Sequence, residues 1–263
     1  MPAEYRYFRD THHTGGLARS WDAADDARVE MFGTDQAVAE HGLGPRYFRN
    51  LRAVCESGWD FSARWLTDPA DLTTIRTTDL WAVDLNAILP RYEEILAAAT
   101  SGPTHTDYIV AADMRRAAIS ARFFDEKRDY FFDVLSSDGS LIPISTAAGM
   151  FPLYAGAATQ SQAKRAIDWK ARHLLKPGGL LTTDITSGQQ RDAPNDLAPL
   201  QWIVIRGLGR YGLNDLAETL RQHWLETCDT VFYASCKFVV KYNVLDPLAP
   251  QGNRGWPKRL LIV

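Results

Sequence analysis

The sequence has few cysteines and no clear pattern of metal ligands. Its three cysteines, Cys55, Cys228 and Cys236, form neither a Cys-x-x-Cys pair nor a set with zinc-ligand spacing. We interpret them as reduced, buried thiols, which indicates a reducing compartment. The pair His12-His13 lies in a polar stretch and is more typical of a surface than of a metal site, which needs three or four ligands. The sequence therefore predicts no metal and no cofactor.

Long apolar runs and a leader are also lacking. No stretch reaches the roughly 18 apolar residues of a membrane span, and the start has no basic, apolar and small-residue pattern. We therefore expect a chain that is neither exported nor membrane-spanning, with a cytoplasmic location. With 29 Lys+Arg against 32 Asp+Glu, the net charge of -3 argues against nucleic acid or an anionic membrane as partner. It favours a neutral small molecule.

Helical periodicity is the main local signal. The 263 residues are 46% hydrophobic, enough for one sizeable core. Apolar residues recur every three or four positions over 79–99, which predicts a helix that Pro90 kinks or splits. A helix over 163–174 should stop at Pro177-Gly178-Gly179, and a long one should follow Asn214 as its cap. The fold class predicted is all-α.

Two stretches depart from this pattern. Residues 130–135 precede a Ser-Asp-Gly-Ser turn and are expected to form a short hairpin. Residues 10–45 are rich in Asp, Ala and Gly, and we interpret them as a solvated insertion with one short helix at 23–31. Their acidic residues are Asp22, Asp25, Asp26, Glu30 and Asp35.

The stretch from Glu56 to Trp65 places one carboxylate, Asp60, among three aromatic residues. Aromatic surroundings disfavour the charged form of a carboxyl group, which is how a general acid is prepared. Two alternatives stay open. Asp60 is equally suited to cap a helix that starts after it, and Arg64, four residues on, would pair with Asp60 if both were helical.

The decapeptide resembles the central active-site motif of the α,α-trehalases, glycoside hydrolase family 37. Further blocks resemble the family in the same order, from about Tyr47 to Val244. They are Asp79-Leu-Trp-Ala-Val-Asp84-Leu-Asn86, Phe151-Pro-Leu-Tyr154, Leu175-Lys-Pro-Gly-Gly-Leu180, Ser187-Gly-Gln-Gln190-Arg191-Asp192-Ala-Pro194 and Lys241-Tyr-Asn-Val244. The resemblance implies an (α/α)6 toroid, here a partial one, and inverting hydrolysis of trehalose to two glucose molecules.

The resemblance also implies roles for particular residues. It makes Asp60 the catalytic general acid. It makes Gly58 a point where the backbone approaches a sugar hydroxyl, and Gln190 and Asp192 substrate-binding residues, because an amide and a carboxylate together offer donors and acceptors. For Gln190 and Asp192 the alternative is a loop held by its own side-chain hydrogen bonds.

Several positions depart from the family pattern. The family carries Trp at Arg191 and Gly-Trp at Asp196-Leu197, and its catalytic base is a glutamate after the Lys-Tyr-Asn-Val block. In this chain no glutamate follows Glu226. Activity of the chain is therefore doubtful, and the alternative is a non-catalytic, trehalase-like carbohydrate-binding remnant or gene fragment.

These departures suggest a division of the chain. We expect a poorly matched segment over 1–45, a trehalase-like toroid portion over 46–246 and a divergent tail over 247–263. Helix faces left without partners in an incomplete ring would favour self-association.

Overall fold

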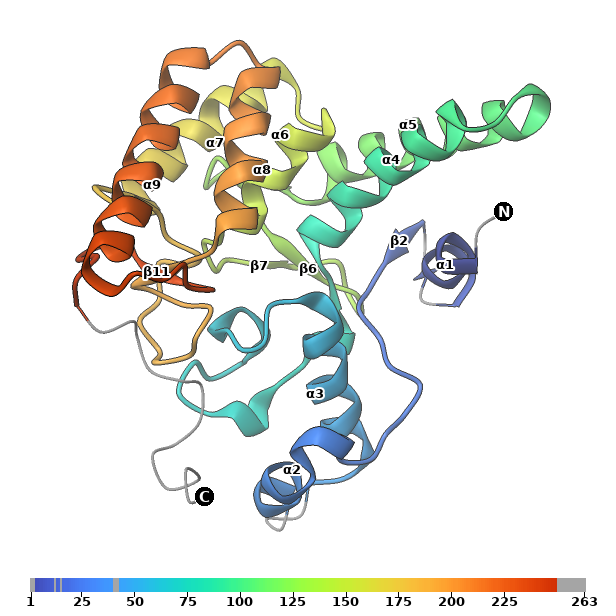
Figure 1. Cartoon of the computed structure of the whole chain (residues 1–263). Coiled ribbons are helices and arrows are strands. Elements are labelled where there is room, and N and C mark those ends of the chain that lie inside the picture. The colour runs from blue at the N-terminus through green and yellow to red at the C-terminus, as the bar shows by residue number, and fades with distance from the viewer. Residues whose placement is uncertain (1–2, 12, 15, 40–42, 250–263) are drawn as a thin grey trace.

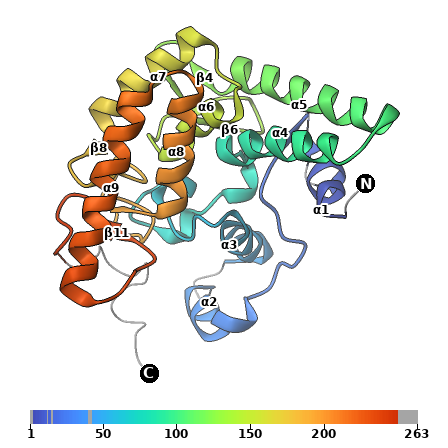
Figure 2. The same ribbon diagram turned by 45° about the horizontal axis from the view of Figure 1, so that its top comes forward.

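The computed structural model describes residues 3–11, 13–14, 16–39 and 43–249. Successive helices form an arc in which α6 packs between α4 and α8, and α8 packs against α9 (Figures 1 and 2). These helices are α4 (Val83–Ala98), α5 (Gly102–Arg122), α6 (Phe151–Ala155), α7 (Gln160–His173), α8 (Ala198–Arg210) and α9 (Asn214–Ser235). The all-α class is confirmed, and the arc has the arrangement of a partial toroid.

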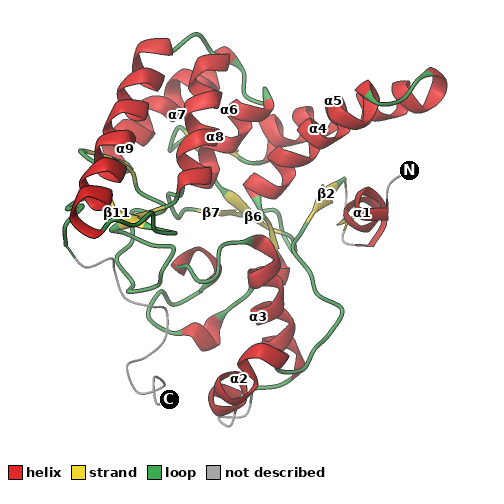
Figure 3. Ribbon diagram, in the orientation of Figure 1, coloured by secondary structure: helices red, strands yellow, loops and turns green. Residues whose placement is uncertain are grey.

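Three further helices belong to the first quarter of the chain: α1 (Ala3–Arg6), α2 (Phe32–Ala39) and α3 (Pro45–Ser57). The strands are short, and each pair joins two loop segments (Figure 3). They form the sheet β3 (Leu80–Trp81), β6 (Asp133–Leu135) and β7 (Leu141–Ile142), and the pairs β1 (His13–Thr14) with β2 (Leu17–Ala18), β4 (Phe124–Asp125) with β5 (Tyr130–Phe131), β8 (Leu175–Lys176) with β9 (Gly179–Leu180), and β10 (Asn195–Asp196) with β11 (Tyr242–Asn243).

Local sequence explains where the helices begin and end. Pro45 occupies the first turn of α3, and Gly58 ends that helix in a left-handed conformation, φ 74°. α4 runs through Pro90 as one helix, so of the two expected outcomes, a kink or a split, the split does not occur, because packing against α5 outweighs one lost hydrogen bond. α9 begins at Asn214, but Leu213 is its N-cap and no side chain caps it. The hairpin expected over 130–135 is confirmed by the pairing of β6 with β7.

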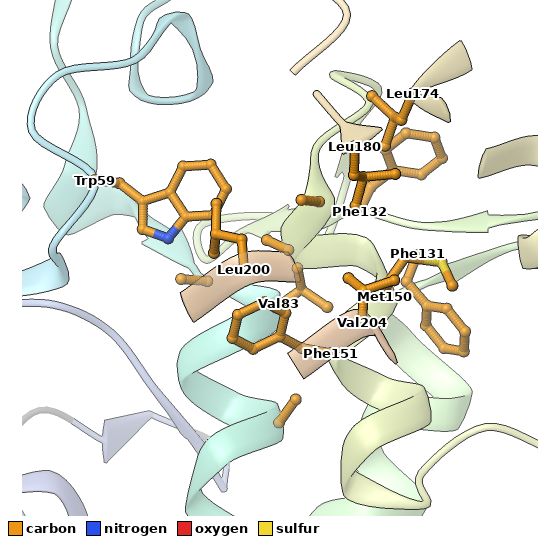
Figure 4. Packing of buried hydrophobic residues seen from close by; sticks show 14 of the residues in the cluster. Trp59, Val83, Phe131, Phe132, Met150, Phe151, Leu174, Leu180, Leu200 and Val204 are labelled. Atoms are coloured by element: carbon orange, nitrogen blue, oxygen red, sulfur yellow. The ribbon is translucent and has the colours of Figure 1, made fainter. Parts of the chain in front are cut away.

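The core lies where the helix arc meets the short paired strands (Figure 4). Phe131 of β5 and Phe132, which precedes β6, pack there with Phe151 of α6 and Val204 of α8. Trp59 belongs to the same cluster and is 5% exposed. The segment that carries Asp60 is therefore attached to the core through its aromatic neighbour.

A fully buried arginine links three parts of the chain. Arg64 donates to both carboxylate oxygens of Asp84, at 2.8 and 2.6 Å, and to both of Asp133, at 2.6 and 2.7 Å. Its guanidinium also lies 4.6 Å from the ring centroid of Trp59 and 4.4 Å from that of Trp65. Burial alone would lower the pKa of Arg64, but Asp133 and Asp84 outweigh it, so the pKa is raised and the charge retained.

The acidic segment before α3 differs from the expectation in two ways. Its helical part is a 3-10 turn at Val29–Met31 followed by α2, rather than a helix at 23–31. Asp35 is not solvated: it is buried and paired with Arg28 at 2.7 Å. The charges of Asp35 and Arg28 compensate each other, which is what permits their burial.

The three cysteines are free, and Cys236 is exposed, so the expectation that all are buried is wrong. Cys236 adopts a left-handed conformation as the C-cap of α9, which places it at the surface. Within the described ranges, no group of three His, Cys, Asp or Glu side chains is arranged to hold a metal, and no helix is long and apolar enough to cross a membrane. His12 lies outside those ranges.

Large apolar side chains are exposed along several helices. They include Ile95 on α4, Met114 on α5, Trp202 on α8, and Tyr233 and Phe238 at the end of α9. Exposed apolar surface of this kind favours association. Self-association through helix faces stays a prediction.

Asn86 fastens the N-terminal segment to α4. Its side chain accepts from the backbone amide of Ala18 at 2.9 Å and donates to the carbonyl of Ala18 at 2.8 Å. The same amide donates to Ala82 at 2.9 Å, and Asn86 is fully buried. One side chain thus satisfies both backbone polar groups of Ala18, which would otherwise be buried without partners.

We predict that Asn86→Ala lowers the free energy of unfolding by about 1–3 kcal/mol, because it leaves buried backbone groups unsatisfied. Urea titration followed by circular dichroism measures this loss. Gln222→Ala, an exposed position on α9, is the control and should change stability little. Equal stability of the Asn86→Ala protein and the wild type would contradict the assigned role.

Candidate functional site

The candidate site begins in the loop that follows α3. Trp59 and Phe61, on either side of Asp60, are 5% and 4% exposed, whereas about a third of the Asp60 side chain, 34%, is accessible. The buried rings therefore hold the backbone while the carboxylate faces outward. Ser62, not Asp60, is the N-cap of the short helix Ala63–Trp65, so the capping alternative for Asp60 is not realised.

A loop more than 120 residues further along the chain meets Asp60. The side-chain amide of Gln190 donates to the backbone carbonyl of Asp60 and lies 3.3 Å from its Oδ2. The guanidinium of Arg191 lies 3.6 Å from Oδ1, and its backbone amide donates to the carbonyl of Phe61 at 2.9 Å. The structure thus brings together Asp60 and Gln190, and it adds a cation that sequence reasoning did not place beside the carboxylate.

Asp192 holds this loop in place through hydrogen bonds. It is fully buried and accepts from the Ser62 hydroxyl at 2.6 Å, the Ala63 amide at 2.8 Å and the Thr183 hydroxyl at 3.1 Å. Ser187 also donates to it. Burial raises the pKa of Asp192 despite these bonds, which lower it. These contacts favour a positioning role, and sugar binding by Asp192 stays a prediction.

Gly58 lies one residue from the buried Trp59 and is exposed. Its left-handed φ of 74° explains the glycine, because other residues adopt this conformation at a cost. A side chain built there would meet no atom within 4 Å, so the space beside Gly58 is open to a ligand.

A hollow of about 200 Å³ lies next to this loop, lined by residues that include Ser57, Ala82 and Asp84. Larger hollows, of about 640 and 510 Å³, lie at the start of α3 and at the far end of α8. Size alone would therefore select a place other than the Asp60 loop. We place the candidate site at Asp60 because the charged and amide side chains converge there.

The two other positions that depart from the family pattern are both buried. Leu197 is 7% exposed and is the N-cap residue of α8. Asp196 is fully buried; Gln201 donates to its Oδ2, while its Oδ1 and the Gln201 Oε1 have no hydrogen-bond partner in the described structure. Burial raises the pKa of Asp196 well above its ordinary value. A protonated Asp196 would relieve the cost of a buried charge.

Comparison with known proteins gives the family. A family model described as Trehalase matches residues 3–257. The chain belongs to the trehalase family. Among curated relatives, the periplasmic trehalase of Xanthomonas oryzae pv. oryzae is 39% identical over 245 residues, which cover 91% of this chain and 43% of that protein. The periplasmic trehalase of Salmonella newport is 38% identical over 248 residues, 92% of this chain and 44% of that protein.

Solved structures agree on the fold. The neutral trehalase from Saccharomyces cerevisiae superimposes with a TM-score of 0.76 at 22% identity, covering 96% of this chain and 53% of that one. A GH63 mannosylglycerate hydrolase from Thermus thermophilus gives a TM-score of 0.53 at 22% identity, covering 68% of this chain and 44% of that one. The chain therefore has the helical toroid fold of these glycosidases, and it spans less than half the length of the curated relatives.

These comparisons correct one expectation and leave another open. The cytoplasmic location is contradicted, because both of these curated relatives are named periplasmic, and the reducing compartment inferred from the cysteines loses its support with it. The division into 1–45, 46–246 and 247–263 stays a prediction, although the family match extends into both outer segments.

Sequence reasoning missed the partners of Arg64. Asp84 and Asp133 lie 20 and 69 residues away along the chain. Arg64 does not pair with Asp60, because it turns into the core while Asp60 turns out. The available signal was the position of Arg64 between Ala63 and Trp65, which are both buried. A buried guanidinium requires carboxylates nearby, so partners of Arg64 were to be expected.

For Asp196 we predict a stability that depends on pH in a defined direction. Because the folded-state pKa is raised, the folded chain holds a proton that the unfolded chain releases near pH 3.8. Stability is therefore fully present below that pH and falls as pH rises toward the folded-state pKa. Asp196→Asn keeps the shape of the side chain and can donate a hydrogen bond to Gln201. Because it has no ionisable carboxyl group, the loss of stability with rising pH should disappear. It should raise the free energy of unfolding at pH 7 by about 1–3 kcal/mol and change it little at pH 3.5.

Urea unfolding at the two pH values measures this difference. Asp107→Asn, at an exposed position on α5, is the matched control and should show no pH-dependent gain. A loss of stability at pH 7 in Asp196→Asn would mean that the carboxylate is ionised and paired.

Proposed function

We propose that the chain forms the acid-bearing part of a trehalase-type glycosidase site and that its substrate is trehalose. The observation that carries the proposal is the convergence of Asp60 with Gln190, whose amide lies 3.3 Å from the Asp60 carboxylate. Membership of the trehalase family and relatives named trehalases support the same substrate. Asp60 is proposed as the general acid, and Gln190 as a ligand of sugar hydroxyls.

The proposed chemistry needs two carboxyl groups. Trehalose joins two glucose units through both anomeric carbons, so an acid must protonate the bridging oxygen while a base activates water on the other side. In an inverting enzyme the two groups stand roughly 6.5–9.5 Å apart. Asp60 is placed to protonate, because its carboxylate faces outward from a loop held on both sides. Gly58 leaves room for a sugar hydroxyl beside it, and Asp192 positions the Gln190 loop.

We propose that two features lower the rate at which this chain hydrolyses trehalose. No glutamate follows Glu226, so the position at which the family carries its base is not filled by the same residue type. Arg191 lies 3.6 Å from the Asp60 carboxylate, where the family carries a tryptophan that would stack on a sugar. A missing base alone costs about two to four orders of magnitude in rate. Hydrolysis by the chain should therefore be very weak or absent.

The second candidate function is a non-catalytic sugar-binding protein. It is favoured by the same ion pair, because a carboxylate held by a guanidinium and an amide remains a hydrogen-bond acceptor for hydroxyls without acting as an acid. Binding of trehalose without turnover would select this candidate. For either function we propose a periplasmic location, by analogy with the curated relatives.

The prediction is that purified wild-type protein releases glucose from trehalose at a rate at least about two orders of magnitude below that of an enzyme with its base in place, and that Asp60→Asn releases none. Asp107→Asn is the control for a lost carboxylate at a remote exposed site and should equal the wild type. Isothermal titration with trehalose is run on the same three proteins. Robust turnover that Asp60→Asn abolishes would show that another carboxylate serves as base, and the weak-activity proposal would be dropped.

A further inference from the structure

A hollow of about 510 Å³ lies at the far end of α8, away from Asp60. Its walls come from α4, α6, α8 and α9, the helices that form the arc in Figure 2. The residues that line it are Arg91, Tyr154, Ile205, Arg206, Gly209, Arg210, Asn214 and Ala217. Pockets of this size hold small molecules.

We infer that this hollow is an anion-binding site and that its ligand is a phosphorylated small molecule. Three of its lining residues are arginines, and none is a carboxylate. The guanidinium group is planar, permanently charged and shaped to donate two parallel hydrogen bonds to a phosphate. The hollow is larger than one phosphate group requires, which leaves room for the rest of the ligand.

Within the described residues, the positive charge of the hollow is only partly compensated. Arg206 and Arg210 are exposed and form no hydrogen bond or ion pair with any residue of the described ranges. Arg91 shares Glu94 with Arg116, a neighbouring arginine that also pairs with Asp113. Of the three arginines that line the hollow, Arg91 alone has a carboxylate partner among the described residues, in a chain whose net charge is -3.

Two observations beside the three lining arginines favour a bound anion here. First, burial lowers the pKa of Arg116, and the neighbouring charges of Arg210 and Arg91 lower it further, which is the repulsion an anion would offset. Second, the Nε of Arg91 is shielded from solvent and has no acceptor in the described structure. A donor left without a partner in this way gains from an incoming phosphate oxygen.

The arginines are held in place by their surroundings. Arg91 lies 5.5 Å from the ring centroid of Tyr154, a cation–π arrangement. Arg210 lies over Gly156, where a Cβ atom would come within 2.6 Å of its Nε, so glycine at this position lets the guanidinium lie close to the backbone. Such contacts reduce the side-chain entropy that is lost on binding.

The hollow is separate from the Asp60 site. Arg91 lies seven residues after Asp84 on α4, about 10 Å further along the helix at 1.5 Å per residue. Arg206 and Arg210 lie eight and twelve residues after the start of α8, about 12 and 18 Å along it. A phosphate site here would therefore be tested independently of sugar hydrolysis.

The test is isothermal titration of the full chain at low salt with inorganic phosphate, glucose 6-phosphate and glucose. We expect saturable binding of both phosphates and none of glucose at this hollow. The double variant Arg206→Gln/Arg210→Gln should weaken phosphate binding at least about tenfold, because it removes two charge-assisted donors. Arg122→Gln/Lys164→Gln removes two exposed cations elsewhere and is the matched control, expected to bind within about twofold of the wild type.

Circular dichroism melts check that both double variants fold. If the double variant unfolds, Arg206→Gln alone is used, because Arg206 is exposed and forms no hydrogen bond or ion pair with the described residues. No saturable phosphate binding by the wild type would overturn the inference. So would equal losses of phosphate binding in the two double variants.

Discussion

The buried ion pairs of Arg64 constrain how the loop that carries Asp60 meets the rest of the structure. A guanidinium that is fully buried must be compensated, and Arg64 takes Asp84 from α4 and Asp133 from the hairpin as partners. Asp133 in turn accepts from the backbone amide of Val83 at 2.8 Å. Such a cluster need not add net stability, but removing one partner would leave an uncompensated charge in the core. It therefore fixes how the loop, α4 and the hairpin meet.

The placement of Asp60 follows from this constraint. Arg64 holds Trp59 against the core, and Asp192 binds the hydroxyl of Ser62 and the amide of Ala63 from the other side. Between these two attachments only the Asp60 side chain is directed to solvent, where Gln190 meets it. The same attachments explain why Arg191 reaches the carboxylate, since its own backbone amide is fixed to Phe61. Arg191 therefore adds a positive charge beside Asp60.

Periodicity and motif order predicted much of this arrangement, and chain-distant contacts account for the rest. The helices α4 and α9, the hairpin after Tyr130 and the approach of the Gln190 loop to Asp60 could all be predicted, because each depends on local pattern or on a resemblance that spans the chain. The burial of Asp35 could not, since an acidic segment gives no sign of which carboxylate meets Arg28. For Asp192, the motif predicted a sugar-binding residue, but only packing shows that its oxygens accept hydrogen bonds from the protein.

A double-mutant cycle on Arg64 and Asp133 tests most directly whether their buried ion pair holds the Asp60 loop to the core. The free energy of unfolding in urea is measured for the wild type, Arg64→Met, Asp133→Asn and the double variant. We expect each single change to be strongly destabilising. The double variant should lose less free energy of unfolding than the two single losses added together, with a coupling of about 1–3 kcal/mol. Losses that simply add, with a coupling near zero, would show that the buried pair does not hold the Asp60 loop to the core and would contradict the account.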